Sequence, residues 1–128
     1  MRIAALSVVA LLVPCISQAE CWTVEHLAGY SAKAFDRYKV SPDGLTGQRF
    51  QISISENKAS VSPANGLSCS KSTPLSVVCA TATGSTSTTE IWALDPSLGK
   101  AYQAQTRAGY GPLDGATLFV GEITGKCQ

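Results

Sequence analysis

Strict alternation of apolar and polar residues is clearest at residues 49–55, which read Arg-Phe-Gln-Ile-Ser-Ile-Ser. Successive side chains of a β-strand point to opposite faces, so Phe50, Ile52 and Ile54 are expected to point into a core. A polar turn follows, and residues 58–62 return as a partner strand. The pattern predicts a β-hairpin with one buried face.

A second hairpin is predicted at residues 90–107, where two β-favouring runs flank the segment Asp95–Lys100. This segment reads Asp-Pro-Ser-Leu-Gly-Lys, with Asp and Pro suited to the first two positions of a type I turn. Gly99 can take the positive φ that closes such a loop. Pairing of the first and last residues of the segment places Trp92 opposite Gln103.

This register divides the second hairpin into two faces. The small, mostly apolar face is expected to point into the core, and it consists of Thr89, Ile91, Ala93, Tyr102, Ala104 and Thr106. The other face combines a tryptophan with amides and opposite charges, and it consists of Glu90, Trp92, Leu94, Gln103, Gln105 and Arg107. On one interpretation Trp92 caps an open barrel end and Glu90 forms a solvated ion pair with Arg107. On the other this face is a recognition surface, because Trp, Tyr and Arg often anchor interfaces.

Residues 21–40 allow two interpretations. Thr23 can cap a short helix, and the apolar residues that follow have fair 3.6-residue spacing. Against a helix, Gly29 lies inside the segment and Trp22-Thr23-Val24 reads equally well as the start of a strand. We expect the short helix, followed by a turn at Ser41-Pro42-Asp43-Gly44.

Further strands are expected at residues 75–82 and at residues 116–123. The second of these segments is apolar on both faces except at Glu122. The threonine-rich segment 83–89 is expected to form a hairpin that turns at Gly84-Ser85. Many short strands separated by turns predict an all-β, mainly antiparallel fold. We expect a small meander barrel or sandwich, with at most one short N-terminal helix.

Residues 1–19 have the features of a secretory signal peptide. Arg2 precedes a mostly apolar run that is too short to span a bilayer, and small residues precede an expected cleavage site after Ala19. Cys15 is expected to leave with the signal, since Pro14 does not suit a lipoprotein cleavage site. We therefore expect one domain at residues 20–128, periplasmic or secreted, with no membrane insertion after cleavage.

Four cysteines remain after cleavage, and in an exported small domain an even number predicts two disulfides. Three pairings are possible. We favour Cys21–Cys127, because chain ends often lie close together, and Cys69–Cys79, which closes a short span rich in turn residues. A metal site is not expected, because there is no Cys-x-x-Cys and His26 is the only histidine.

Charge and motifs argue against nucleic-acid binding and against most catalysis. The 10 Lys and Arg nearly balance the 9 Asp and Glu, with no basic stripe for a phosphate backbone. The chain has no nucleophile elbow, phosphate-binding loop or dinucleotide-binding motif. A carboxylate pair could support hydrolysis, and Glu90 and Glu122 are the candidates. Turn positions account for Asp95 and Asp114, and no cofactor is expected.

Residues 102–109 read Tyr-Gln-Ala-Gln-Thr-Arg-Ala-Gly, and the chain ends in Cys127-Gln128. This part resembles the bacterial C-type lysozyme inhibitors, which have a Tyr-x-x-x-Ser/Thr-Lys-x-Gly run and a cysteine near the C-terminus. The inhibitors' Ser-Gly-x-x-Tyr loop is not matched, because Leu98 stands at the serine position. The resemblance implies a small exported β-barrel that presents loop residues to an enzyme cleft.

Three functions remain as hypotheses. The first is a non-enzymatic bacterial β-domain that binds a protein or envelope macromolecule, for instance as an inhibitor of a host or envelope enzyme. Its binding residues would be Trp92, Glu90, Gln103, Gln105, Arg107 and Tyr110, the last in a glycine-rich loop. The second is a lipocalin-type carrier of a small apolar ligand. The third is a small hydrolase that depends on Glu90 or Glu122.

Overall fold

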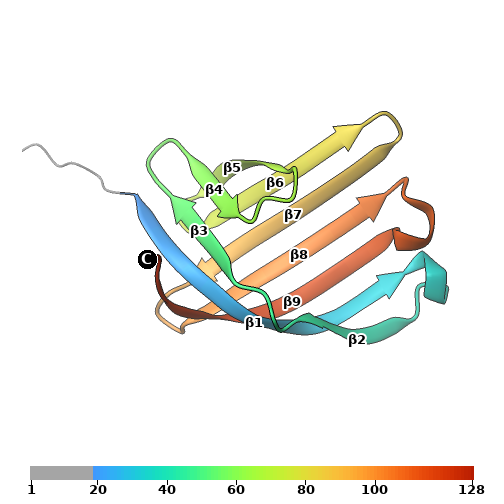
Figure 1. The fold of residues 1–128 in the computed structure, drawn as a ribbon, viewed down its shortest axis with the longest axis horizontal. Coiled ribbons are helices and arrows are strands. Elements are labelled where there is room, and N and C mark those ends of the chain that lie inside the picture. The colour runs from blue at the N-terminus through green and yellow to red at the C-terminus, as the bar shows by residue number, and fades with distance from the viewer. Residues whose placement is uncertain (1–18) are drawn as a thin grey trace, which may run out of the picture.

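The computed structural model describes residues 19–128 and shows one antiparallel sheet that curls into a nearly closed barrel (Figure 1). The predicted signal peptide lies outside the described residues, apart from Ala19. The strands are β1 (Glu20–Lys33), β2 (Val40–Leu45), β3 (Phe50–Ile54), β4 (Ala59–Ser62), β5 (Ser68–Thr73), β6 (Ser76–Thr83), β7 (Thr86–Asp95), β8 (Lys100–Ala108) and β9 (Gly115–Lys126). The sheet has the order β4-β3-β1-β9-β8-β7-β6-β5, and β2 pairs with the C-terminal half of β1. Two 3-10 turns complete the fold, η1 (Ala34–Asp36) and η2 (Gly111–Leu113).

The expected N-terminal helix is wrong, because residues 20–33 form the long strand β1. A β-bulge explains the misleading spacing: the register against β9 shifts between Glu25 and Ala28, and His26 has a φ of 59°. An extra residue in one strand breaks the two-residue alternation. Val24 and Leu27 therefore both point into the core although they are three residues apart, which imitates helical spacing.

The expected turn at residues 41–44 is also wrong, since these residues lie inside β2. Pro42 is tolerated there because β2 pairs only with β1, and an edge strand can accept a residue without an N–H. The chain instead reverses at Arg37 and Tyr38, which both have positive φ, and the Tyr38 N–H donates to the Lys33 carbonyl oxygen at 2.8 Å.

The other predicted hairpins are confirmed. In the β7–β8 hairpin Asp95 pairs with Lys100 and Trp92 with Gln103. The Leu98 N–H donates to the Asp95 side chain at 3.2 Å, which closes the turn as expected. The β3–β4 hairpin and the β6–β7 hairpin, which turns at Gly84, form as predicted.

Both predicted disulfides are confirmed. Cys21–Cys127 joins the two ends of the described chain, and the Cys127 N–H also donates to the Cys21 carbonyl oxygen at 3.0 Å. Cys69–Cys79 links directly opposed residues of β5 and β6. Disulfides persist in oxidising compartments, so this pair indicates an extracytoplasmic environment.

The apolar core fills the end of the barrel where β3, β4 and β5 complete the wall. Phe50 and Trp92 meet at its centre, with ring centroids 5.0 Å apart. The buried apolar residues are Trp22, Val24, Leu27, Phe50, Ile52, Ile54, Val61, Val77, Cys79, Trp92, Leu94, Ala101 and Phe119. The expected inward direction of Phe50, Ile52 and Ile54 is confirmed.

Glu25, beside the bulge in β1, links this strand to β9 and to the residue that precedes β3. Its carboxylate accepts hydrogen bonds from Thr124 Oγ1 at 2.6 Å and from Arg49 Nε at 3.2 Å. These bonds, the one from Thr124 first, hold the pKa of Glu25 below its ordinary value of 4.5.

A carboxyl whose pKa is lowered by folding stabilises the protein above its unfolded-state pKa and loses this effect as pH falls through the folded-state pKa. We therefore expect urea unfolding to show that Glu25→Gln lowers stability at neutral pH and flattens the loss of stability below about pH 4.5. Glu56→Gln is the control, because Glu56 is an exposed carboxyl in the β3–β4 turn. Equal acid profiles for Glu25→Gln and the wild type would contradict this role.

Candidate functional site

The two faces of the β7–β8 hairpin are reversed relative to the prediction. Trp92 is fully buried and Glu90, Gln103 and Leu94 are nearly so, whereas Ile91 and Tyr102 of the expected core face are 46% and 41% exposed. The register was predicted correctly, so only the choice of inner face was wrong. The polar face of this hairpin lines the barrel interior.

The interior changes character along each strand of this part of the sheet. On β7 the inward residues Leu94 and Trp92 belong to the core, and Glu90 and Thr88 continue the same face as polar residues. On β8 the inward residues, from the core toward the polar end, are Ala101, Gln103, Gln105 and Arg107. On the antiparallel strand β9, Phe119 lies at the core and Thr117 lies toward the polar end. The barrel therefore has an apolar floor and a polar upper half.

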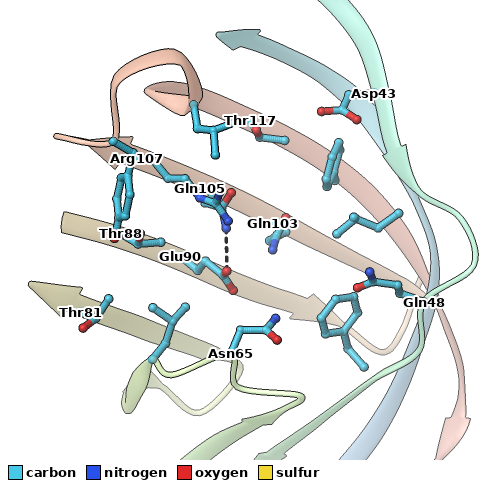
Figure 2. Close-up of a pocket in the computed structure, with 16 residues that line it drawn as sticks. Asp43, Gln48, Asn65, Thr81, Thr88, Glu90, Gln103, Gln105, Arg107 and Thr117 are labelled. Atoms are coloured by element: carbon cyan, nitrogen blue, oxygen red, sulfur yellow. Dashed lines mark hydrogen bonds between the residues drawn. The ribbon is translucent and has the colours of Figure 1, made fainter. Parts of the chain in front are cut away.

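The polar half encloses a cavity of about 570 Å³ (Figure 2). Its wall comes from both sides of the barrel, with the sheet β6–β9 facing β2, β3 and the loops before β3 and β5. It is lined by Asp43, Leu45, Gln48, Phe50, Asn65, Leu67, Thr81, Thr88, Glu90, Gln103, Gln105, Arg107, Tyr110, Leu113, Thr117 and Phe119. This volume lies in the range typical of small-molecule sites.

The Glu90 carboxylate is held on both oxygens by neighbouring side chains. Trp92 Nε1 donates to Oε1 at 3.2 Å. Gln105 Nε2 donates to Oε2 at 2.7 Å (Figure 2). The tryptophan of the floor and the amide of the wall therefore fix the direction of the carboxylate. A carboxylate oxygen has two lone pairs, so each oxygen can accept a further hydrogen bond.

The Arg107 guanidinium is in a different situation. Its Nε is buried, and it is the one buried side-chain nitrogen or oxygen within residues 19–128 that lacks a hydrogen-bond partner. Neither Glu90 nor Arg107 takes part in the ion pairs Arg49–Glu25 and Lys126–Glu20, so the solvated Glu90–Arg107 pair of the first interpretation does not form. An unsatisfied buried donor costs about 1–3 kcal/mol, and more when it is charged.

The loop between β8 and β9 forms part of the rim of the cavity. Its conformation depends on Asp114, which accepts the Gly109 N–H at 3.1 Å and the Tyr110 N–H at 2.6 Å. The Thr88 hydroxyl donates to the Tyr110 hydroxyl oxygen at 3.0 Å. Tyr110 is thereby fixed at the mouth, with 37% of its surface exposed.

The predicted binding residues Glu90, Gln103, Gln105, Arg107 and Tyr110 all line this one cavity. Trp92 does not line it, but supports it from below through Glu90. Sequence reasoning did not find the opposite wall, where Asp43, Gln48 and Asn65 come from β2 and from loops (Figure 2). Placing β2 in this wall would have required residues 21–40 to be interpreted as a strand, because β2 pairs with that strand.

Glu90 and Glu122 cannot act as a pair on one substrate. Glu90 points into the barrel, whereas Glu122 is exposed on the outer face of β9, opposite Lys100. Asp95 and Asp114 have the turn roles that the sequence predicted. Within residues 19–128, no three His, Cys, Asp or Glu side chains gather closely enough to hold a metal ion, and no helix is long and apolar enough to cross a bilayer.

Comparison of the chain with protein families, with curated proteins and with solved structures finds no match.

Proposed function

We propose that the protein is an exported, non-enzymatic binding domain that holds one small polar molecule in the mouth of its barrel. The observation that carries this proposal is the position of Arg107, which lines a cavity of about 570 Å³ and whose buried Nε has no hydrogen-bond partner. A ligand oxygen at this position would form a charge-assisted hydrogen bond, the stronger class of such bonds. Export to the periplasm or beyond is part of the proposal, and the two disulfides support it.

The charges of the cavity argue against an anionic ligand. Asp43 and Glu90 contribute two negative charges to the lining and Arg107 contributes one positive charge, so the lining has a net charge of −1. Arg107 offers a donor, and Glu90 offers acceptor capacity beyond its bonds to Trp92 and Gln105. The matching ligand has a hydrogen-bond acceptor and a donor close together.

The floor of the cavity indicates that the ligand contains a ring. Phe50 and Phe119 are both nearly buried and both line the cavity, with Leu45 and Leu67 beside them. Aromatic side chains at a floor favour a flat or ring-shaped body. We therefore infer a ring-sized, neutral, polar ligand, such as a heterocyclic amide or a monosaccharide. The apolar ligand expected of a lipocalin-type carrier fits the upper half of this cavity poorly, because unpaired polar groups would face it.

The test is native mass spectrometry of the protein recovered after export, followed by calorimetric titration with three probe groups: nucleobases and cyclic ureas, monosaccharides, and aromatic carboxylates. We expect a neutral probe to bind and the carboxylates to bind weakly or not at all. Tight binding of the carboxylates alone would contradict the charge argument, and absence of binding by all probes and of any co-purified molecule would contradict the proposal.

Arg107→Gln is expected to weaken binding of the recognised probe by about 10–100-fold, because a hydrogen bond to a charged group contributes about 1.5–3 kcal/mol. Arg49→Gln is the matched control, since Arg49 has a 66% exposed side chain paired with Glu25 and does not line the cavity. Titration of both variants measures the effect. Equal affinities of Arg107→Gln and the wild type would show that the ligand does not contact Arg107.

Binding of a macromolecule, for instance as an inhibitor of a host or envelope enzyme, is the second candidate. Exposed Tyr110 and Leu113 at the rim favour it, because a projecting partner loop could contact both while entering the cavity. Capture from periplasmic and host extracts on the immobilised oxidised protein tests this function. A single retained protein that is lost with Tyr110→Ser would support it, and retention unaffected by Tyr110→Ser would place any partner elsewhere.

A further inference from the structure

The outer face of the sheet carries three cross-strand rows without a charged side chain, over β1, β9, β8, β7 and β6. The middle row is Tyr30, Leu118, Ala104, Ile91 and Val78. The row on one side is Ala28, Val120, Tyr102, Ala93 and Ser76, and the row on the other side is Ala32, Ala116, Thr106, Thr89 and Ala80. We call these three rows the outer apolar face.

Burial shows that this face is uncovered in the single chain. Leu118 is 66% exposed, Tyr30 59% and Val120 47%, and Ile91 and Tyr102 are close to these values. Together the five large side chains expose on the order of 500 Å², the upper end of the apolar patches that monomers tolerate. An antiparallel sheet with one face on a core normally has a polar outer face, so this pattern is reversed.

We propose that a second copy of this chain packs against the outer apolar face and forms a symmetric dimer. The face has relief that suits a self-complementary interface, because its large side chains lie in two of the rows and the third row has only alanines and threonines. Around a two-fold axis the same patch meets itself, so the large residues of one copy can settle over the small residues of the other. With its alanines included, the face approaches the roughly 800 Å² per partner that a stable interface buries.

Charge also favours a second copy over an unlike partner. The outer apolar face offers no charge with which a charged partner could pair, and the described chain has equal numbers of Lys plus Arg and of Asp plus Glu, so two copies do not repel. The next row along the strands is Asp95, Lys100 and Glu122, which carries both signs. This row supplies the polar rim that surrounds the apolar centre of most interfaces.

The dimer leaves the proposed ligand site free. Side chains of β7, β8 and β9 alternate between the outer apolar face and the barrel interior, so a partner that covers Ile91 and Leu118 does not touch Glu90 or Thr117. Two barrels back to back therefore keep both mouths open. This inference does not depend on the proposed function, because it uses only the opposite side of the sheet.

Sedimentation of the oxidised, exported protein up to about 100 μM tests the dimer, a concentration well above a Kd of about 1 μM for a modest interface. Leu118→Lys and Ile91→Lys place charges on the outer apolar face, and both positions are exposed, so folding is expected to persist. Leu98→Lys is the matched control, since Leu98 is 68% exposed in the β7–β8 turn, outside the face.

We expect the wild type and Leu98→Lys to sediment as dimers, and the two face variants to raise the dissociation constant at least 10-fold. Near-ultraviolet circular dichroism confirms that each variant retains its packed tryptophans. A wild-type protein that stays monomeric at the highest concentration would overturn the proposal. This holds also if the outer apolar face of that monomer binds lipid vesicles. A dimer that survives both Leu118→Lys and Ile91→Lys would overturn it as well.

Discussion

Replacement of Cys21 and Cys127 by alanine is expected to lower the free energy of unfolding by about 4–5 kcal/mol, the largest effect we predict for a change that removes little core volume. The disulfide joins residues 106 positions apart, so its loss releases nearly the whole described chain in the unfolded state. In the chain-entropy model the stabilisation grows with the logarithm of the loop length. Denaturation in urea, with the transition followed by tryptophan fluorescence, measures the change.

The second disulfide is the internal comparison. Cys69–Cys79 closes a loop of 10 positions, for which the same model gives about 3 kcal/mol. Cys79 is also fully buried, so the Cys69→Ala/Cys79→Ala variant loses packing in addition. A loss well below about 4 kcal/mol for the Cys21/Cys127 variant would show that the chain ends are held mainly by the β1 ladders rather than by the covalent link.

Most strands could be predicted because local chemistry determines them. The turn at Asp95–Gly99 requires little beyond the preferences of Asp, Pro and Gly, and it fixes the whole β7–β8 register. Phe50, Ile52 and Ile54 show a clean two-residue period because β3 lies over the apolar floor. The disulfides followed from an even number of cysteines and from the position of two of them at the chain ends.

The N-terminal strand could not be predicted because its signal is interrupted by a bulge. Periodicity identifies a strand only while every residue advances the alternation by one step. The register shift around His26 adds a residue, so inward Val24 and Leu27 are spaced like neighbours on a helix. Only pairing with β2 and β9, which is a tertiary property, resolves the ambiguity.

The inner face of the β7–β8 hairpin was assigned wrongly for a related reason. The assignment assumed that the more apolar face points inward, and this holds only for a barrel filled with a core. Glu90, Gln105 and Arg107 point inward here because the upper half of the barrel encloses a cavity. Exceptions to simple patterning are expected at functional or strained sites. The reversed polarity, apolar outside and polar inside, therefore points to the two surfaces for which we propose binding.

Trp92→Ala is expected to lower the free energy of unfolding by about 3–5 kcal/mol, as for other large aromatic residues removed from a core. Trp92 is fully buried, packs against Phe50 and is the largest fully buried side chain of the described chain. One interpretation of the sequence placed this residue on an exposed recognition surface, and there its removal would change stability by no more than about 0.5 kcal/mol. Urea denaturation of the variant, monitored by circular dichroism, distinguishes a position in the core from a position on the exposed surface.

Trp92→Phe separates the two roles of this side chain. Phenylalanine keeps most of the ring volume but lacks the N–H that donates to Glu90 Oε1 at 3.2 Å. The loss leaves a nearly buried carboxylate with only the bond from Gln105, so we expect a cost of about 1–3 kcal/mol and a less fixed Glu90. Glu90→Gln in the Trp92→Phe background should recover part of this cost, since a neutral amide is easier to bury than a charge. If Trp92→Phe leaves both stability and ligand affinity unchanged, Trp92 contributes packing alone, and Glu90 takes its direction from Gln105.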